Sequence, residues 1–151
     1  MRGLFLLLAS LVVLFDQLTK TLAQTHLLRG SSQLIIPRIF HLTLIENQGI
    51  AFGLFQGGDK FLLVLITLSI AGLVFFGLRA APFQLKTQWG IGLILGGAVG
   101  NWIDRIRLGA VVDFLDFRIW PVFNLADTAI TIGVGILLLD VLRPKKSSHV
   151  S

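Results

Sequence analysis

Residues 61 to 78 read FLLVLITLSIAGLVFFGL, a run without a single charged side chain. A helix needs roughly 17–25 residues to cross the hydrocarbon core of a bilayer, so this run is long enough to span it. Three other runs of the chain are almost as apolar. The sequence therefore predicts four transmembrane helices, at about residues 3–22, 61–78, 87–105 and 120–140, in a single membrane domain that covers residues 1–151.

The composition of the whole chain agrees with a membrane protein. Of its 151 residues, 54% are hydrophobic and only 14% are charged, whereas a soluble domain carries roughly 25% charged residues. The net charge of +5 does not indicate nucleic acid, because Arg143, Lys145 and Lys146 follow directly on the last apolar run, where membrane proteins place cytoplasmic anchors. The absence of cysteine excludes disulfides and a thiol nucleophile.

Two of the four runs are less certain spans. The third is marginal in length, and the first qualifies only if Asp16 and Lys20 lie near an interface or face the protein interior. The first run could instead be a cleaved signal peptide that ends near Thr21-Leu22-Ala23. Asp16 and Lys20 interrupt the region before that point, which favours a retained helix.

A polar segment of about residues 24–59 separates the first two runs. It contains the turn signal Gly30-Ser31-Ser32, and residues 41–44 alternate polar and apolar side chains, which indicates short strands. The predicted fold class is an all-α membrane protein with a small β-rich extramembrane cradle between the first two helices.

Four spans place both termini on the same side of the membrane. Lysine and arginine are divided almost equally between the two faces, so their count barely chooses an orientation. Seven of the eight acids lie on or near the face away from the termini, and only Asp140 lies near the termini. We expect both termini to be cytoplasmic. We expect the opposite, outer face to carry a site, in which the basic residues interact with nearby acids.

Two acids embedded among apolar residues are the main candidates for chemistry. Asp127 precedes a long apolar stretch, and Asp113 lies in VVDF at the edge of a helix and a loop. Ionisable groups inside a membrane segment are costly and often functional. The alternatives are a structural acid paired with an arginine for Asp127 and an ordinary loop carboxylate for Asp113. If the two side chains meet, they would share one proton and could activate water as aspartic proteases do.

Other polar residues at helical spacing admit two interpretations each. Asn101 and Arg105 share a helical face, and Arg105 could hold a carboxylate or a peptide carbonyl. Alternatively, Asp104 forms an interfacial ion pair with Arg105 or Arg107. Asp16 and Lys20, at i and i+4, suit a structural ion pair.

Two further patterns limit the possibilities. Gly92, Gly96 and Gly100 form a small-xxx-small stripe that favours close helix packing over substrate contact. The zinc-protease motif HExxH and the serine-hydrolase motif GxSxG are both absent from the sequence. His26 and His41 are expected to be solvated or interfacial. No metal or other cofactor is expected.

Five motifs taken together resemble the lipoprotein signal peptidases, the type II signal peptidases of bacteria. The resemblance runs from Asp16 to Ile130, with the motifs in family order. They are Asp16-Gln17-Leu18-Thr19-Lys20, Asn47-Gln48-Gly49-Ile50-Ala51-Phe52, Gly96-Gly97-Ala98-Val99-Gly100-Asn101-Trp102-Ile103-Asp104-Arg105, Gly109-Ala110-Val111-Val112-Asp113-Phe114 and Phe123-Asn124-Leu125-Ala126-Asp127.

The resemblance implies an aspartic endopeptidase with Asp113 and Asp127 as its catalytic residues. The implied substrates are prolipoproteins whose cysteine carries diacylglycerol, cleaved on the N-terminal side of that cysteine. The implied substrate-binding residues are Asn47, Gly49, Asn101, Arg105 and Asn124. Asp16, Lys20 and Asp104 are expected to give structural support.

The resemblance also implies a setting for the enzyme. It implies the bacterial inner membrane, a site near the outer face covered by a short helix from the 24–59 segment, and inhibition by the cyclic peptide globomycin. We expect membrane lipid as a partner, no nucleic acid, and a monomer. The interval between Asp113 and Asp127 is shorter than in many relatives, which leaves substrate range open. The rival hypotheses are a small proton-coupled transporter or channel subunit using Asp127, and a non-catalytic lipoprotein chaperone.

Overall fold

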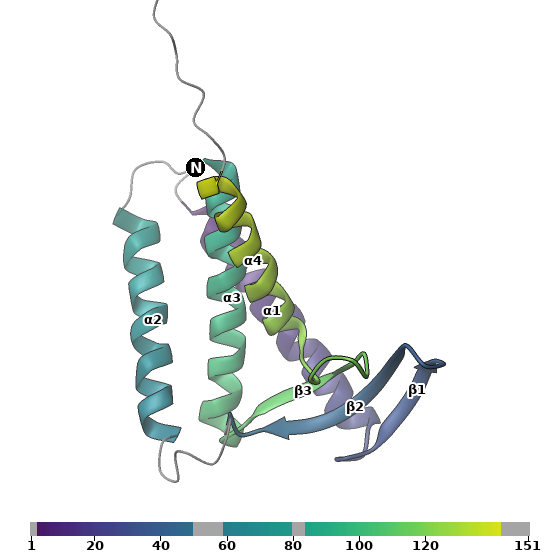
Figure 1. Ribbon diagram of the computed structural model, residues 1–151. Helices are drawn as coiled ribbons and strands as arrows, with labels where there is room; N and C mark the ends of the chain where they lie inside the picture. Colours follow the sequence, from purple (N-terminus) through teal and green to yellow (C-terminus); the bar gives the residue numbers. More distant parts are fainter. Residues whose placement is uncertain (1–2, 50–58, 80–83, 143–151) are drawn as a thin grey trace, which may run out of the picture.

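A computed structural model describes residues 3–49, 59–79 and 84–142 of the chain. Three of the four helices pack together, the fourth stands beside them, and a small sheet lies across one end (Figure 1). The helices are α1 (Leu4–His26), α2 (Asp59–Arg79), α3 (Leu85–Leu108) and α4 (Leu125–Leu142). The strands are β1 (Ser32–Ile36), β2 (Phe40–Asn47) and β3 (Val111–Asp116).

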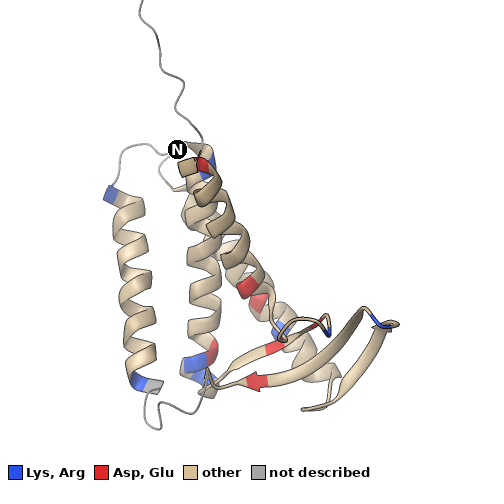
Figure 2. Cartoon of the chain, in the orientation of Figure 1, with Lys and Arg blue, Asp and Glu red and all other residues tan. Residues whose placement is uncertain are grey.

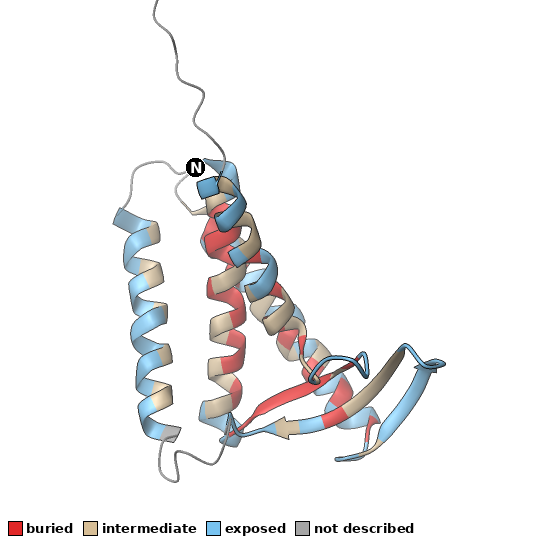
Figure 3. Cartoon of the chain, viewed as in Figure 1, coloured by how far each residue is buried: buried red, intermediate tan, exposed pale blue. Residues whose placement is uncertain are grey.

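Within the described ranges, three helices are long and apolar enough to cross a membrane, namely α1, α2 and α4. Helix α3 has 24 residues but a less apolar composition, because it packs against the other three helices and buries much of its surface in protein (Figure 3). Apolar side chains are needed where a helix meets lipid, and α3 meets mainly its neighbours. Helix α2 lies to one side of the other helices and is the most apolar of the three candidate spans.

Close contact between α1 and α3 depends on the glycine stripe. A Cβ atom added at Gly96 would lie 2.6 Å from Cβ of Val12, and one added at Gly100 would lie 2.5 Å from Oδ2 of Asp16. Real Cβ atoms do not approach other atoms so closely, so only glycine fits at these two positions. The packing interpretation of the stripe is confirmed, and it brings the polar residues of α1 and α3 into contact.

Helix boundaries differ from the sequence expectation at two places. Helix α1 continues to His26 and turns the side chains of Asp16 and Lys20 into the protein, where both are buried. Helix α4 begins at Leu125, not near residue 120, because Phe123 pairs with Leu115 of β3 and holds the preceding segment in extended form.

The sheet is antiparallel with strand order β1-β2-β3, and its third strand is the main difference from the predicted cradle. The prediction placed the β structure only between the first two helices. In fact β3 comes from the connection between α3 and α4, so Asp113 lies within a strand and not at a helix–loop edge. Asp116, at the end of β3, is buried.

The sheet is fixed to the end of α1 by a small apolar core. Ala23 and Leu27 pack there against Leu44, Val112 and Phe114. This core sets the position of β3, and therefore of Asp113, relative to the helices. The short helix over the site was predicted within residues 24–59. The described part of this segment shows no such helix after α1, and residues 50–58 lie outside the described residues.

Candidate active site

The first turn of α4 fixes Asp127 through a reciprocal pair of hydrogen bonds. The backbone N–H of Asp127 donates to Oδ1 of Asn124 at 2.9 Å, and the backbone N–H of Asn124 donates to Oδ2 of Asp127 at 3.2 Å. This is the arrangement of a capping box, in which the residue before the helix and the third helical residue satisfy each other's free N–H groups. The Asp127 carboxylate is therefore held at the end of the helix that faces the sheet.

Asp113 is brought to the same place by β3. Its Oδ1 accepts a 2.7 Å hydrogen bond from Nδ2 of Asn124, and its Oδ2 accepts a 3.0 Å bond from Nδ2 of Asn47 on β2. Asn47 in turn accepts the N–H of Gly49 at 2.9 Å, in a turn where Gly49 has the left-handed φ of 72° that favours glycine. Asn124 thus contacts both acids, and Gly49 shapes the turn beside Asn47.

Asn101 of α3 completes the link between the two acids. Its Nδ2 donates to Oδ1 of Asp127 at 2.8 Å, while its Oδ1 accepts from Nδ2 of Asn124 at 3.1 Å and from Nζ of Lys20 at 2.9 Å. An ammonium group can only donate, so Lys20 requires the oxygen of Asn101 and directs the amide nitrogen to Asp127. The orientation of Asn101 is thereby set by a residue outside the site.

Lys20 lies at the centre of a buried polar network. Its Nζ contacts Oδ2 of Asp16 at 2.8 Å and Oδ2 of Asp104 at 2.7 Å. Asp16 also accepts the backbone N–H of Ala126 at 3.0 Å, and Asp104 accepts that of Val112 at 3.1 Å. The two acids therefore tie α1 and α3 to the residues that precede Asp127 and Asp113.

The partner of Asp104 differs from the sequence alternative. Asp104 pairs with Lys20 of α1 and not with Arg105 or Arg107. Gln17, to which the sequence assigned no role, donates from Nε2 to Asp104 at 2.9 Å and to Gly100 O at 3.2 Å. The sequence around Gln17 does not predict these hydrogen bonds, because their acceptors lie more than 80 residues away in the chain.

Arg105 is half-buried at the end of α3. Its NH1 donates to the carbonyl oxygen of Asn101 at 3.2 Å, and its charge acts on both Asp127 and Asp113. The guanidinium also lies beside the turn at Gly49. Arg107, by contrast, is exposed, and within the described part of the chain its side chain reaches only Gln17, at 3.5 Å. Acidic and basic residues meet where the helices join the sheet (Figure 2).

Two hollows open beside this cluster. One of about 370 Å³ is lined by Asn47, Gln48 and Asp113 together with Ile45, Glu46, Pro121 and Val122. A smaller one of about 100 Å³ is lined by Arg105, Gln48, Gly109 and residues of α2. Gln48 borders both, so an extended chain could pass from one to the other. Oxygen acceptors, amide donors and two cations, Arg105 and Lys60, line this path.

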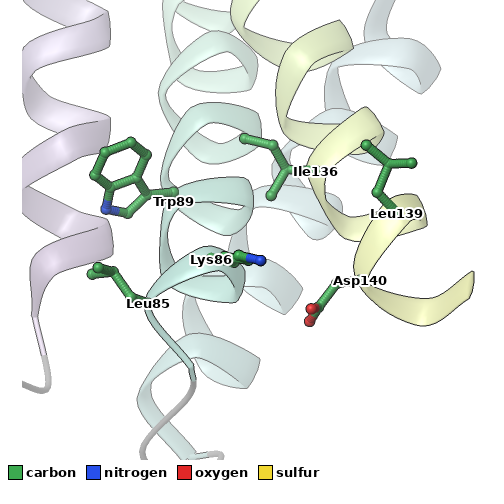
Figure 4. A pocket seen from close by; sticks show the side chains of 6 residues that line it. All are labelled: Leu85, Lys86, Trp89, Ile136, Leu139 and Asp140. Carbon is green, nitrogen blue, oxygen red and sulfur yellow. The ribbon is translucent and has the colours of Figure 1, made fainter. Parts of the chain in front are cut away.

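A hollow of similar size, about 380 Å³, lies at the opposite end of the helices (Figure 4). It is lined by Leu85, Lys86, Trp89, Ile136, Leu139 and Asp140. Its described lining is largely apolar, and Asp140 is the single acid among the described residues there, hydrogen-bonded by Thr87 at 3.2 Å. Because the described residues bring two acids together only at the sheet end, we place the candidate active site there.

Burial raises the pKa of Asp113 to about 6, and the negative charge of Asp127 adds to the increase. Hydrogen bonds from Asn47 and Asn124 act in the opposite direction. A carboxyl group with a pKa near 6 holds a proton over part of the physiological range. The pair of acids can therefore carry one proton between them.

Asp127→Asn is expected to lower the pH at which Asp113 takes up its proton, because the substitution removes a neighbouring negative charge. The measurement is infrared difference spectroscopy of the protonated carboxyl band against pH in purified protein. Asp140→Asn, on the same helix but at its other end, should leave the titration near 6. A titration that is unchanged by Asp127→Asn would show that the two acids do not interact.

Comparison with known proteins adds an independent finding. The family profile described as "Signal peptidase (SPase) II" matches residues 8–143. A lipoprotein signal peptidase of Brevibacillus brevis is 42% identical over 147 residues, which are 96% of this chain and 99% of that protein. One of Staphylococcus aureus is 38% identical and covers 93% of this chain and 89% of its own. A solved structure described as a bacterial membrane enzyme shares 37% identity, with a TM-score of 0.88 and 95% coverage of both chains.

Proposed function

The chain belongs to the signal peptidase II family of aspartic peptidases, which remove signal peptides from prolipoproteins, and from this premise we propose that Asp113 and Asp127 are its catalytic residues. The observation that carries the proposal is the continuous hydrogen-bond chain from Asp113 through Asn124 and Asn101 to Asp127. Two acids linked in this way, Asp113 buried and Asp127 half-buried, match the proton chemistry of peptide hydrolysis. Membership of the family also removes the transporter alternative.

The arrangement supports a division of roles between the two acids. Asp127 accepts hydrogen bonds from Asn101 and from the backbone N–H of Asn124, and these bonds orient its carboxylate to take the proton from water. Asp113, whose pKa is raised, donates its proton to the scissile carbonyl oxygen. The water oxygen bonds to the carbonyl carbon. As the carbon–nitrogen bond breaks, the proton held by Asp127 passes to the leaving amine, and one hydroxyl proton of the tetrahedral intermediate returns to Asp113. The product is then a carboxylic acid, and both side chains are restored.

Two of the other site residues, Arg105 and Asn47, would hold the substrate backbone. Arg105 and Asn47 border the hollows on either side of Gln48, so a peptide passing there could donate to Asn47 and accept from Arg105. Asn101 and Asn124 are occupied by the two acids and act by fixing their positions. In this proposal the scissile bond lies on the N-terminal side of the diacylglyceryl cysteine.

The chain is a multi-pass membrane protein, and we extend this to a specific topology. Helix α3 is the fourth span, because it runs beside the other helices and is long enough at 24 residues. Both termini are cytoplasmic, and the sheet and the site lie near the outer face of the bacterial inner membrane. The enzyme acts as a monomer, binds globomycin at the same site, and uses no cofactor.

The test of this proposal is cleavage of a purified precursor by the reconstituted protein. A precursor with diacylglycerol on its cysteine should be cut, and the same precursor without lipid should be cut poorly or not at all. Each buried methylene adds about 0.8 kcal/mol to membrane attachment, so the lipid holds the scissile bond at the depth of the site. EDTA should leave the rate unchanged. Equal cleavage of both precursors, or zinc-dependent activity, would contradict the proposal.

Arg105→Ala is expected to slow cleavage about ten- to a hundredfold, and Arg107→Ala much less. Loss of one charge-assisted hydrogen bond costs roughly 1.5–3 kcal/mol, which gives that change in rate if the bond forms in the transition state. Arg105 is half-buried beside the acids, whereas Arg107 is exposed. The measurement is kcat/KM for the lipidated precursor in equally folded variants. Equal effects would remove Arg105 from the site.

A further inference from the structure

The outer end of the sheet carries apolar side chains that no described part of the protein covers. Ile36 and Ile39 flank the turn between β1 and β2, and Ile119 and Trp120 lie in the loop after β3. Ile119 is 92% exposed and Trp120 is 69% exposed. We call these four residues, with Arg38, the cradle tip. Large exposed apolar groups that lie together indicate a surface with a partner.

Aromatic packing joins the two halves of the cradle tip. The ring of Phe117 lies 4.9 Å from that of Phe40, at the start of β2, and 5.9 Å from that of Phe123. The loop that holds Ile119 and Trp120 is therefore seated beside the turn that holds Ile36 and Ile39. The four apolar side chains belong to one surface made from two segments distant in sequence.

Contacts of Arg118 also hold in place the loop that contains Ile119 and Trp120. Its NH2 lies 2.6 Å from Oγ of Ser32 and 2.6 Å from Nδ1 of His41, and its backbone N–H donates to Asp116 at 2.9 Å. These contacts reach all three strands. The loop cannot easily fold back to bury Ile119 and Trp120, so their exposure is a fixed property of the fold.

The turn between β1 and β2 lies away from the helices. Figure 1 shows this end of the sheet, the farthest from α3, rising to about the level at which α4 begins. Helix α1 still exposes Leu18 and Leu22 close to its end, so its lipid-facing surface continues to that level. At this level the apolar helices meet the polar sheet, which is where we expect the boundary between lipid and water.

The charge at the cradle tip is complementary to phospholipid headgroups. Arg38 is exposed and forms no ion pair or side-chain hydrogen bond with the described part of the chain, whereas Arg29, near the other end of the sheet, pairs with Glu46. Tryptophan favours the membrane interface, and arginine binds phosphate through paired N–H groups. Both side chains occur together in the cradle tip.

We propose that the cradle tip inserts into the lipid leaflet beside the sheet, with Ile119 and Trp120 among the acyl chains and Arg38 on anionic phosphate groups. The sheet is then attached to the membrane at both ends, through α1 and through the tip. This attachment holds the hollow beside Asp113 at a constant height over the bilayer. It is independent of the assignment of the catalytic residues.

Single cysteines test this directly, because the chain contains none. Ile119→Cys is spin-labelled in vesicles, and its collision rates with oxygen and with a water-soluble nickel chelate are compared. Leu68→Cys, exposed in the middle of α2, is the lipid reference, and Arg29→Cys is the water reference. Position 119 should resemble position 68, with a severalfold higher oxygen-to-nickel ratio than position 29. A ratio equal to that of position 29 would overturn the proposal.

The headgroup contact has its own test. The ratio at position 119 should rise when phosphatidylglycerol replaces part of a phosphatidylcholine vesicle, and this rise should disappear in Arg38→Gln. A rise that Arg38→Gln does not change, or no rise at all, would overturn the role of Arg38. If position 119 is aqueous in both lipids and becomes protected only when precursor is added, the cradle tip contacts substrate and not lipid. Circular dichroism and thermal unfolding confirm that each variant is folded.

Discussion

Asp113→Asn and Asp127→Asn are each expected to lower the rate of precursor cleavage about 1,000-fold or more, since general acid–base groups contribute roughly 10²–10⁴ each. Asparagine keeps the size of the side chain but can neither carry the negative charge nor exchange the proton. The double variant should be hardly slower than either single variant, because residues that act as a unit fail together. Single-turnover cleavage of a lipidated precursor measures all three rates.

The control for this series is Asp140→Asn. Asp140 lies on the same helix as Asp127 but lines the hollow at its opposite end, with Thr87 as its hydrogen-bond partner. Its substitution should leave the rate within about twofold, an effect of roughly 0.4 kcal/mol. Thermal unfolding of each variant separates lost chemistry from lost folding. Substantial activity in either Asp113→Asn or Asp127→Asn would remove the basis for an aspartic mechanism at this site.

Lys20→Met is expected to destabilise the protein by about 3–5 kcal/mol, the usual effect of removing one partner from a buried ion pair. The Lys20 ammonium is the shared counterion of Asp16 and Asp104, and all three side chains are almost completely buried. Without it, two carboxylates remain close together in a medium of low polarity. Thermal unfolding in detergent should show a large fall in the midpoint.

Activity should fall along with stability in Lys20→Met. Lys20 directs the amide of Asn101, and Asn101 donates to Asp127. Folded Lys20→Met protein, assayed below its unfolding temperature, should therefore cleave more slowly than the wild type. Lys86→Met, at the opposite end of the helices, is the matched control and should change stability by less than about 0.5 kcal/mol. Equal midpoints for the two variants would show that the buried network does not stabilise the fold.

Much of the candidate site could be inferred from local sequence. The uncharged run at 61–78 predicts a lipid-facing helix, because only an apolar surface is stable there. Asp16 and Lys20 lie one helical turn apart, which predicts their ion pair, and the glycine spacing predicts close packing of α3. Asp113 and Asp127 were identified because acids are rare among apolar residues. Each of these patterns involves residues that are close together in the sequence.

Other features depend on contacts between distant parts of the chain. Residues 111–116 form a strand because they pair with β2, roughly 70 residues earlier, and the local pattern of VVDFLD does not show this. The pairing of Asp104 with Lys20 and the bridging position of Gln17 arise because the glycines of α3 let α1 approach closely. Side-chain spacing along one helix cannot reveal a partner on another.

The sequence by itself determined that this chain lies in a membrane and which two acids are unusual. The tertiary structure decided that these acids belong to one site, since Asp113 arrives on a strand and Asp127 on a helix, and two asparagines from α3 and the start of α4 join them. The physical reason is the distance over which each effect acts. Hydrophobic periodicity and the cost of a buried charge act on neighbouring residues, whereas a shared proton requires atoms a few ångströms apart, which only the packing of α1, α3, α4 and the sheet provides.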